Sequence, residues 1–128
     1  MIIGRSVRNL VLSGKYELVW SYILDVENYY NPYEQRRNTI KDWRSIAKID
    51  IAETPDILFL AEQIKDKGVK TKDALHIACA IQAKCDYFIT TDKKLLNKSI
   101  DGILIVDPIE FIKEREDDNN DDRYGFKK

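Results

Sequence analysis

The sequence predicts an α/β fold, a single domain with a parallel sheet covered by helices on both faces. Short apolar runs rich in β-branched and aromatic residues alternate along the chain with longer segments of helical periodicity, which is the pattern of that class. The length of 128 residues fits one domain that can bury a core without disulfides or a structural metal. No internal repeat or Gly/Ser linker divides it.

Composition excludes several classes of protein. The charged fraction is 34% and the formal net charge is -1, so a nucleic-acid role would require a local basic patch. Cys79 and Cys85 lie six residues apart and the chain has one histidine, which supports neither a zinc site nor a disulfide framework. No segment resembles a signal peptide and no apolar run approaches about 18 residues, so we expect a cytoplasmic protein without a membrane span.

Helical spacing and breakers define the elements expected in the first half of the chain. Ser13-Gly14 ends the first helix, and Asn31-Pro32 ends the second. The third helix is strongly charged, which predicts an outer, solvent-facing position. The expected elements are a helix over 1–12, a strand over 17–21, helices over 22–30 and 33–48, and a strand over 49–52.

The second half contains the most apolar helix and strand of the chain. One helix begins at Thr54 or Pro55 and ends at Gly68, and Thr71 is the expected N-cap of the next. The domain is expected to span 1–113, and the acidic, apolar-poor residues 114–128 to form a disordered tail. The remaining expected elements are strands over 86–90 and 103–106 and short helices over 93–96 and 108–112.

Three carboxylates are placed to converge at one edge of the predicted sheet. Glu27 follows one strand, Asp92 ends another, and Asp73 begins the helix that leads into that strand, so all three lie toward the strands' carboxyl ends. Such oxygen ligands suit Mg²⁺ or Mn²⁺, which indicates metal-assisted phosphodiester hydrolysis. Without a cation, mutual repulsion is expected to raise the pKa of at least one of them.

Each of these residues also has a purely structural interpretation. Asp73 in a first helical turn stabilises the helix dipole, Asp92 can cap the helix that follows it, and Glu27 can be one acid of a solvated face. Asp25 is the alternative acid near Glu27. We expect His76, on an otherwise apolar helix, to be a hydrogen-bonded core residue, with a general base as the alternative.

Hydroxyl and aromatic residues near these acids have supporting roles. Thr90 is expected to orient the acids by hydrogen bonding. Four tyrosines near Asn31-Pro32 can stack on single-stranded RNA, and a core or dimer contact explains them equally well. They are Tyr22, Tyr29, Tyr30 and Tyr33.

The same residues resemble the PIN-domain nucleases, whose C-terminal half contains D-A-x-x-x-A-x-A and then an apolar strand ending T-x-D. Asp73 to Ala80 matches the first pattern, and Tyr87 to Asp92 the second. The segment from Leu18 to Pro32 is similar to the family's second strand and helix, in which a serine opens the helix and an acid follows six residues later. Ser21 and Glu27 fit that spacing, and the resemblance covers about Leu10 to Ile112.

The resemblance implies a function. It implies a metal-dependent ribonuclease like the toxins of prokaryotic toxin and antitoxin pairs, with an RNA substrate, homodimerisation and an antitoxin protein as inhibitor. It also implies that Glu27, Asp73 and Asp92 bind Mg²⁺ or Mn²⁺, supported by Ser21 and Thr90.

One part of the family pattern is not present in this sequence. Family members begin with a strand that carries the first acidic residue, and no matching segment precedes the helix expected over 1–12. We therefore expect a PIN-like domain without its N-terminal strand and with weak ribonuclease activity. The alternative is a catalytically inactive PIN-like module that binds a partner chain.

Overall fold

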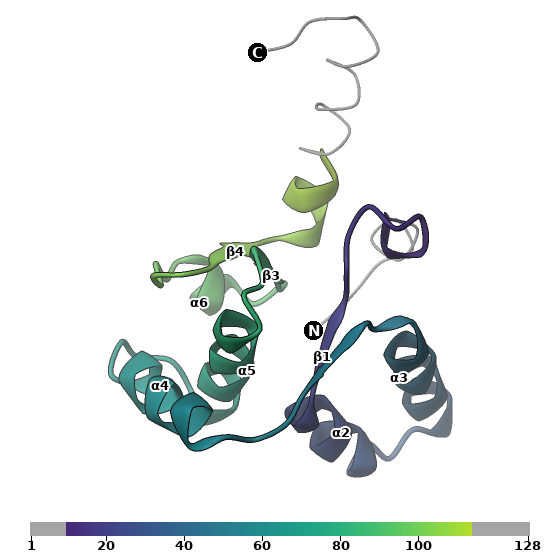
Figure 1. Cartoon of the computed structure of the whole chain (residues 1–128), viewed down its shortest axis with the longest axis horizontal. Helices are drawn as coiled ribbons and strands as arrows, with labels where there is room; N and C mark the ends of the chain where they lie inside the picture. Colours follow the sequence, from purple (N-terminus) through teal and green to yellow (C-terminus); the bar gives the residue numbers. More distant parts are fainter. Residues whose placement is uncertain (1–9, 114–128) are drawn as a thin grey trace, which may run out of the picture.

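The computed structural model describes residues 10–113 and has the predicted α/β architecture. Two halves lie side by side, one containing α2 and α3 and the other α4, α5 and α6 (Figure 1). Helical residues 10–12 end at Gly14, whose φ is +83°, as the sequence predicted. The elements are β1 (Val19–Ser21), α2 (Tyr22–Tyr29), α3 (Glu34–Ile46), β2 (Ile49–Ile51), α4 (Pro55–Lys65), α5 (Thr71–Gln82), β3 (Tyr87–Ile89), α6 (Lys93–Leu96) and β4 (Leu104–Val106).

The strands pair in parallel, as predicted, but in two separate pairs. β1 pairs with β2, with Val19 opposite Ile49, and β3 pairs with β4, with Tyr87 opposite Leu104. Within residues 10–113, no strand pairing joins β1 to β3, and the strands form two small parallel sheets.

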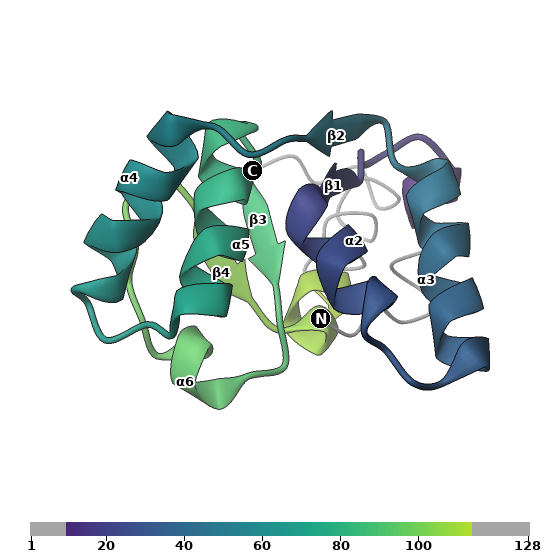
Figure 2. The same cartoon turned by 90° about the horizontal axis from the view of Figure 1, so that it is seen from below.

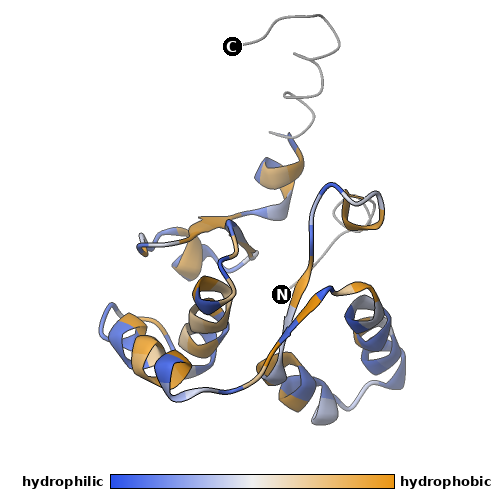
Figure 3. Cartoon of the chain, in the orientation of Figure 1, coloured by the Kyte–Doolittle hydropathy of each residue, from blue (hydrophilic) through white to orange (hydrophobic). Residues whose placement is uncertain are grey.

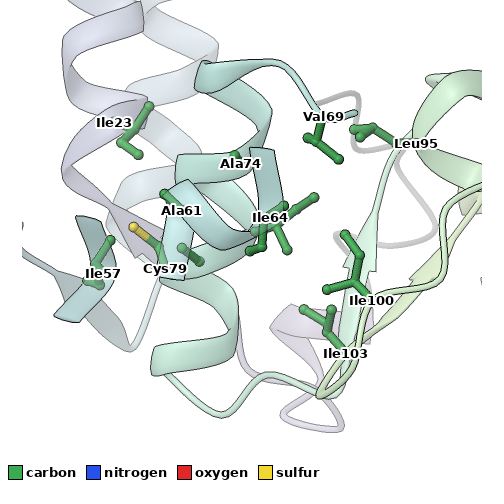
Figure 4. Packing of buried hydrophobic residues seen from close by; sticks show 12 residues of the cluster. Ile23, Ile57, Ala61, Ile64, Val69, Ala74, Cys79, Leu95, Ile100 and Ile103 are labelled. Carbon is green, nitrogen blue, oxygen red and sulfur yellow. The ribbon is translucent and has the colours of Figure 1, made fainter. Parts of the chain in front are cut away.

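The core lies mainly between α4 and α5 and extends to α6 and β4. Ile57, Ala74 and Ile77 are completely buried, and Figure 4 shows Ile64, Val69 and Ile100 packed in the same cluster. Burying a side chain of the size of Ile contributes about 1.5–3 kcal/mol, so this cluster provides most of the hydrophobic stabilisation of this half. α5 is consequently the fixed support for the residues on its other face.

Capping explains the helix boundaries. Thr54 caps α4, because its side chain accepts a hydrogen bond from the Ile57 amide, and Pro55 occupies the first helical position. The expected N-cap at Thr71 is wrong by one residue: Lys70 is the N-cap and Thr71 is already helical, because Lys70 is extended and its carbonyl accepts from the Ala74 amide. This shift places Asp73 in the first turn of α5, as expected.

α3 is the outer helix that its charge predicted. None of its residues is buried, and its hydrophilic surface stands out in Figure 3 against the apolar faces of α4 and α5. Among the described residues, no helix is both long enough and apolar enough to cross a bilayer. The expected acidic tail over 114–128 and most of the expected first helix lie outside the described residues.

Candidate active site

A cavity of about 430 Å³ lies between the two halves of the molecule. The side chains of Glu27, Asp73, His76 and Asp92 line it, and they come from α2, from α5 and from the residue that precedes α6. These elements are distant in sequence: α2 belongs to the half that contains α3, and α5 and α6 belong to the half that contains α4 (Figure 2). Glu27, Asp73 and Asp92 thus line one cavity.

Glu27 is held by two side chains from the first turns of α5. His76 Nε2 lies 2.5 Å from Glu27 Oε1, and Lys72 Nζ lies 3.5 Å from Glu27 Oε2. His76 is 14% exposed and Glu27 is 32% exposed at the side chain, so this pair is partly shielded from water. His76 is thus a hydrogen-bonded histidine, as expected, but its partner is a carboxylate of the candidate site.

The pKa of the Glu27 carboxyl is lowered. The hydrogen bond from His76 is the main cause that lowers the pKa of the Glu27 carboxyl below 4.5, and the charges of His76 and Lys72 act in the same direction against partial burial. The expected rise is therefore not found at Glu27, whose carboxylate lies next to His76 and Lys72 rather than next to another acid.

Asp92 has the capping role that was its structural alternative. Its Oδ1 accepts a hydrogen bond of 2.9 Å from the Lys94 amide and so caps α6. Thr90 is buried, and its Oγ1 accepts a hydrogen bond of 3.1 Å from the Asp92 amide, which fixes the turn that carries the carboxylate. Asp92 itself is exposed. The cap uses one carboxylate oxygen, and Asp92 still lines the cavity.

Ser21 lines the same cavity and is buried. It is 5% exposed and precedes α2, but its side chain does not cap that helix. A hydrogen bond from Ser21 partly offsets the effect of burial on Cys79, which raises the pKa of that thiol to about 11. Ser21 therefore contacts the wall of the cavity formed by α5.

A family comparison identifies the fold. A protein-family model described as PIN domain matches residues 9–100. The chain belongs to the PIN-domain family. PIN domains are generally metal-dependent nucleases. Searches of curated proteins and of solved structures found no match.

The carboxylates of this PIN domain are suitable ligands for a divalent ion, but their arrangement is not that of a metal site. Carboxylate oxygens are the ligands that Mg²⁺ and Mn²⁺ prefer. In the described part of the chain, however, no group of three His, Cys, Asp or Glu side chains is arranged to hold a metal. Both oxygens of Glu27 already face side-chain partners, His76 and Lys72. The site as it stands is a set of acids around one cavity rather than a formed coordination shell.

A second, larger groove of the PIN domain meets the candidate site at Glu27. Its volume is about 1320 Å³, and Glu27 and Leu24 line both spaces. Tyr30 is 76% exposed and Tyr33 is 59% exposed, while Asn28 is buried beside them. The aromatic, basic and polar residues lining the groove include Trp20, Tyr22, Asn28, Tyr30, Tyr33, Arg36, Trp43 and Lys72. Tyr29, the remaining tyrosine of the predicted group, stacks edge-on against Tyr30 at 5.0 Å between ring centroids.

Sequence reasoning missed two features of this PIN-domain site. It did not identify Lys72 as a partner of Glu27, although a cation next to Asp73 in a helix's first turn was a usable signal. It also did not predict that the small residues Cys79, Ala80 and Ala83 line the cavity. Cys79 and Ala80 lie near the end of α5, and Ala83 is its C-cap.

Proposed function

We propose that this PIN domain is a metal-dependent endoribonuclease that hydrolyses RNA phosphodiester bonds, of the type found as toxins in toxin and antitoxin pairs. The observation that supports it is the gathering of Glu27, Asp73 and Asp92, from three separate elements, around one cavity. In this proposal the protein is a homodimer in the cytoplasm, and an antitoxin protein inhibits it.

The carboxylates of Glu27, Asp73 and Asp92 would bind Mg²⁺ or Mn²⁺, which would supply positive charge at the scissile phosphate and a more acidic water molecule. The protein's own contribution is to position these acids. Thr90 fixes the turn of Asp92 through the 3.1 Å hydrogen bond, and His76 holds Glu27 against α5. These contacts reduce the cost of ordering the acids when substrate binds.

The aromatic groove supports a single-stranded substrate. Exposed rings at Tyr30 and Tyr33 provide stacking faces, and Arg36 and Lys72 provide positive charge for phosphates. Because Glu27 lines both the groove and the cavity, a strand that lies in the groove reaches the carboxylates. The overall charge of -1 makes such a local path necessary for RNA binding.

A second function, a catalytically inactive module that binds a partner chain, has one observation in its favour. No three acidic, histidine or cysteine side chains within 10–113 are arranged to hold a metal, and Glu27 is paired with His76 and Lys72 instead. For this reason we propose that the 128-residue chain cleaves RNA only weakly.

Digestion of single-stranded RNA with Mn²⁺, with and without EDTA, tests the enzyme. We expect weak cleavage that EDTA removes, and complete loss of it in Asp73→Asn, because an amide is nearly isosteric but lacks the charge that a metal requires. Millimolar Mn²⁺ should also raise the melting temperature of the wild type and not of Asp73→Asn.

The matched control is Asp56→Asn. Asp56 is likewise in the first turn of its helix, α4, but does not line the cavity. It should retain cleavage and the response to Mn²⁺. A melting temperature indifferent to Mn²⁺, together with no EDTA-sensitive cleavage, would contradict the metal-dependent nuclease.

A further inference from the structure

Two short segments of the chain are rich in lysine. Residues 65–72 contain four lysines and one aspartate, and residues 93–98 contain three lysines and no acid, so each segment has a formal charge of +3. The whole chain has a formal charge of -1. A chain of that charge needs a local basic patch to bind nucleic acid, and these segments supply the charge for one.

The fold brings the two segments together. Lys98 Nζ donates a hydrogen bond of 3.0 Å to the carbonyl oxygen of Lys67. Val69 and Leu95 are both buried in the core cluster, and Figure 4 shows them side by side. The loop between α4 and α5 accordingly lies next to α6 in Figure 2. One buried apolar residue in each segment thus fixes the position of the lysines around it.

Most of these lysines hold their ammonium groups in solvent. Lys67, Lys70, Lys93 and Lys94 are exposed. Within residues 10–113, none of these four side chains takes part in an ion pair. We define these four residues as the lysine surface. Its charge is therefore available to a ligand.

The lysine surface has the composition of a site for a polyanion rather than of a protein interface. None of the large apolar side chains that are exposed in the described part of the chain belongs to residues 65–72 or 93–98. Protein interfaces are depleted in lysine, and a membrane-bound surface also needs exposed apolar side chains. A nucleic-acid backbone requires positive charge along its path, which the lysine surface provides.

The lysine surface borders the cavity at two of its carboxylates. Lys94 lies two residues after Asp92, and its amide donates a hydrogen bond of 2.9 Å to Asp92 Oδ1. Lys70 is the N-cap of α5, whose first turn contains Asp73. Neither lysine lines the cavity itself. A phosphate chain that leaves the cavity beside either acid therefore meets these lysines next.

We propose that the lysine surface binds the phosphates of single-stranded RNA on one side of the scissile bond, while the aromatic groove holds the strand on the other side. The inference rests on the proposed function, because it takes RNA as the ligand. The groove meets the cavity at Glu27, and the lysine surface meets it at Asp73 and Asp92. The lysines contact only the backbone, so this part of the binding is independent of base sequence.

The probes are fluorescently labelled oligouridylates of about four and about twelve nucleotides, which span the usual range of single-strand sites. Anisotropy in EDTA at several salt concentrations measures binding without cleavage. We expect the wild type to bind the longer RNA more tightly. Lys67→Gln combined with Lys94→Gln should weaken that binding at least about tenfold at low salt and reduce its salt slope by about 1.4, since each phosphate contact on a single strand contributes about 0.7. The affinity for the shorter RNA, which the groove binds by stacking, should not change.

The matched control is Lys41→Gln combined with Lys48→Gln. It changes the net charge by the same amount, and both lysines are exposed and lie outside the linings of the groove and the cavity. It should leave the affinity for the longer RNA and the salt slope nearly unchanged. Lys67→Arg combined with Lys94→Arg keeps the charge and should bind like the wild type.

A loss confined to the Lys67 and Lys94 glutamine variant and to the longer RNA supports the lysine surface. Equal losses in both glutamine pairs would overturn it, because the effect would then follow net charge alone. Unchanged RNA affinity in the Lys67 and Lys94 variant would also overturn it. Vesicles of phosphatidylserine that bind the wild type but not that variant would then assign the surface to a membrane.

The two proposals fail in different ways. EDTA-sensitive cleavage by a protein whose RNA affinity is indifferent to Lys67 and Lys94 would retain the nuclease and reject only the lysine path. Loss of RNA affinity in the Lys67 and Lys94 variant, without any cleavage by the wild type, would retain the lysine path and reject the nuclease. No binding of either RNA by the wild type would reject the lysine path outright.

Discussion

Glu27 contacts His76 and Lys72, and it lines both the cavity of the candidate site and the groove. Its carboxylate accepts from His76 and lies beside Lys72, so two residues of α5 fix a side chain of α2. Hydrogen bonds to a charged partner contribute more to stability than neutral ones, on the order of 1–3 kcal/mol. At the scale of single residues, this contact links the α2 half of the molecule to the α5 half.

The lowered pKa of Glu27 predicts how this contribution depends on pH. A carboxyl group whose folded pKa is below its unfolded value of 4.5 stabilises the protein fully above that value. The contribution is lost as pH falls through the folded pKa. We expect Glu27→Gln to lower the free energy of unfolding by about 1 kcal/mol near pH 6, with the difference from wild type shrinking below pH 4.5. Urea unfolding at several pH values measures it.

Glu62→Gln is the control for this prediction. Glu62 is 72% exposed at the side chain and forms an i,i+3 pair with Lys65 on α4. Exposed pairs of this kind contribute little, so the variant should match the wild type across the pH range. A Glu27→Gln protein more stable than wild type at pH 6 would show that the acid is strained rather than stabilised by its partners.

Sequence patterns could place Glu27 near the site but could not identify its partners. Glu27 was preferred to Asp25 because it follows a strand and lies six residues after Ser21. Asp25 Oδ1 accepts a hydrogen bond from Trp20 Nε1 and lies 3.6 Å from Arg44 Nε. The contact with His76 joins residues 49 positions apart. Such a contact depends on how α2 packs against α5, and local periodicity contains no information on that packing.

At the scale of elements, α2 and α3 form the groove that we assign to RNA. Tyr33 precedes α3, and the Arg36 guanidinium lies 4.8 Å from the centre of the Tyr33 ring. Tyr30 follows α2. We expect Tyr30→Ala and Tyr33→Ala each to weaken binding of single-stranded RNA about tenfold, since stacking contributes about 1–3 kcal/mol per base. Anisotropy of labelled RNA in EDTA measures binding without cleavage.

Phe59 provides the control for the groove. It is 67% exposed, comparable to the groove tyrosines, but lies on α4 and outside the groove lining. Phe59→Ala should leave the RNA affinity unchanged, and Tyr33→Phe should retain it, because phenylalanine keeps the stacking face. Equal loss in Phe59→Ala would indicate nonspecific surface effects. No loss in either tyrosine variant would remove the groove from the RNA path.

The bounds of these elements were predictable because they depend on local signals. Thr54 with Pro55 started α4 as expected, and the short strands fell within the predicted apolar runs. The error at Thr71 was of one residue, since a threonine at that position fits either an N-cap or a first helical turn. The pairing of β1 with β2 and of β3 with β4 could not be deduced from local patterns, because pairing depends on which strands lie next to each other in the folded chain.

At the scale of the whole molecule, α5 connects the halves. Its buried face packs on α4, and its other side carries Asp73 and His76 into the cavity between the sheets. Residues of β1 and β3 line the same cavity as the carboxylates, so a strand placed between β1 and β3 would also close one side of the site. The geometry of the acids and the continuity of the sheet are therefore coupled.

This coupling gives the last prediction, which concerns a chain extended at its N-terminus by a short apolar strand that carries an aspartate near its end. The PIN family places its first acid on such a strand, so the extension would add a carboxylate and join the two sheets. We expect EDTA-sensitive RNA cleavage to rise by at least about a hundredfold over the 128-residue chain, because positioning of reacting groups contributes several kcal/mol to catalysis.

Three chains are compared in the same Mn²⁺ digest: the 128-residue chain, the extended chain, and the extended chain with asparagine in place of the added aspartate. The asparagine version should join the sheets, and raise the melting temperature, without raising the rate. Inactivity of all three, with folding confirmed, would favour the inactive binding module over the enzyme. Full EDTA-sensitive activity of the 128-residue chain would show that Glu27, Asp73 and Asp92 suffice, since the metal would then need no further acid.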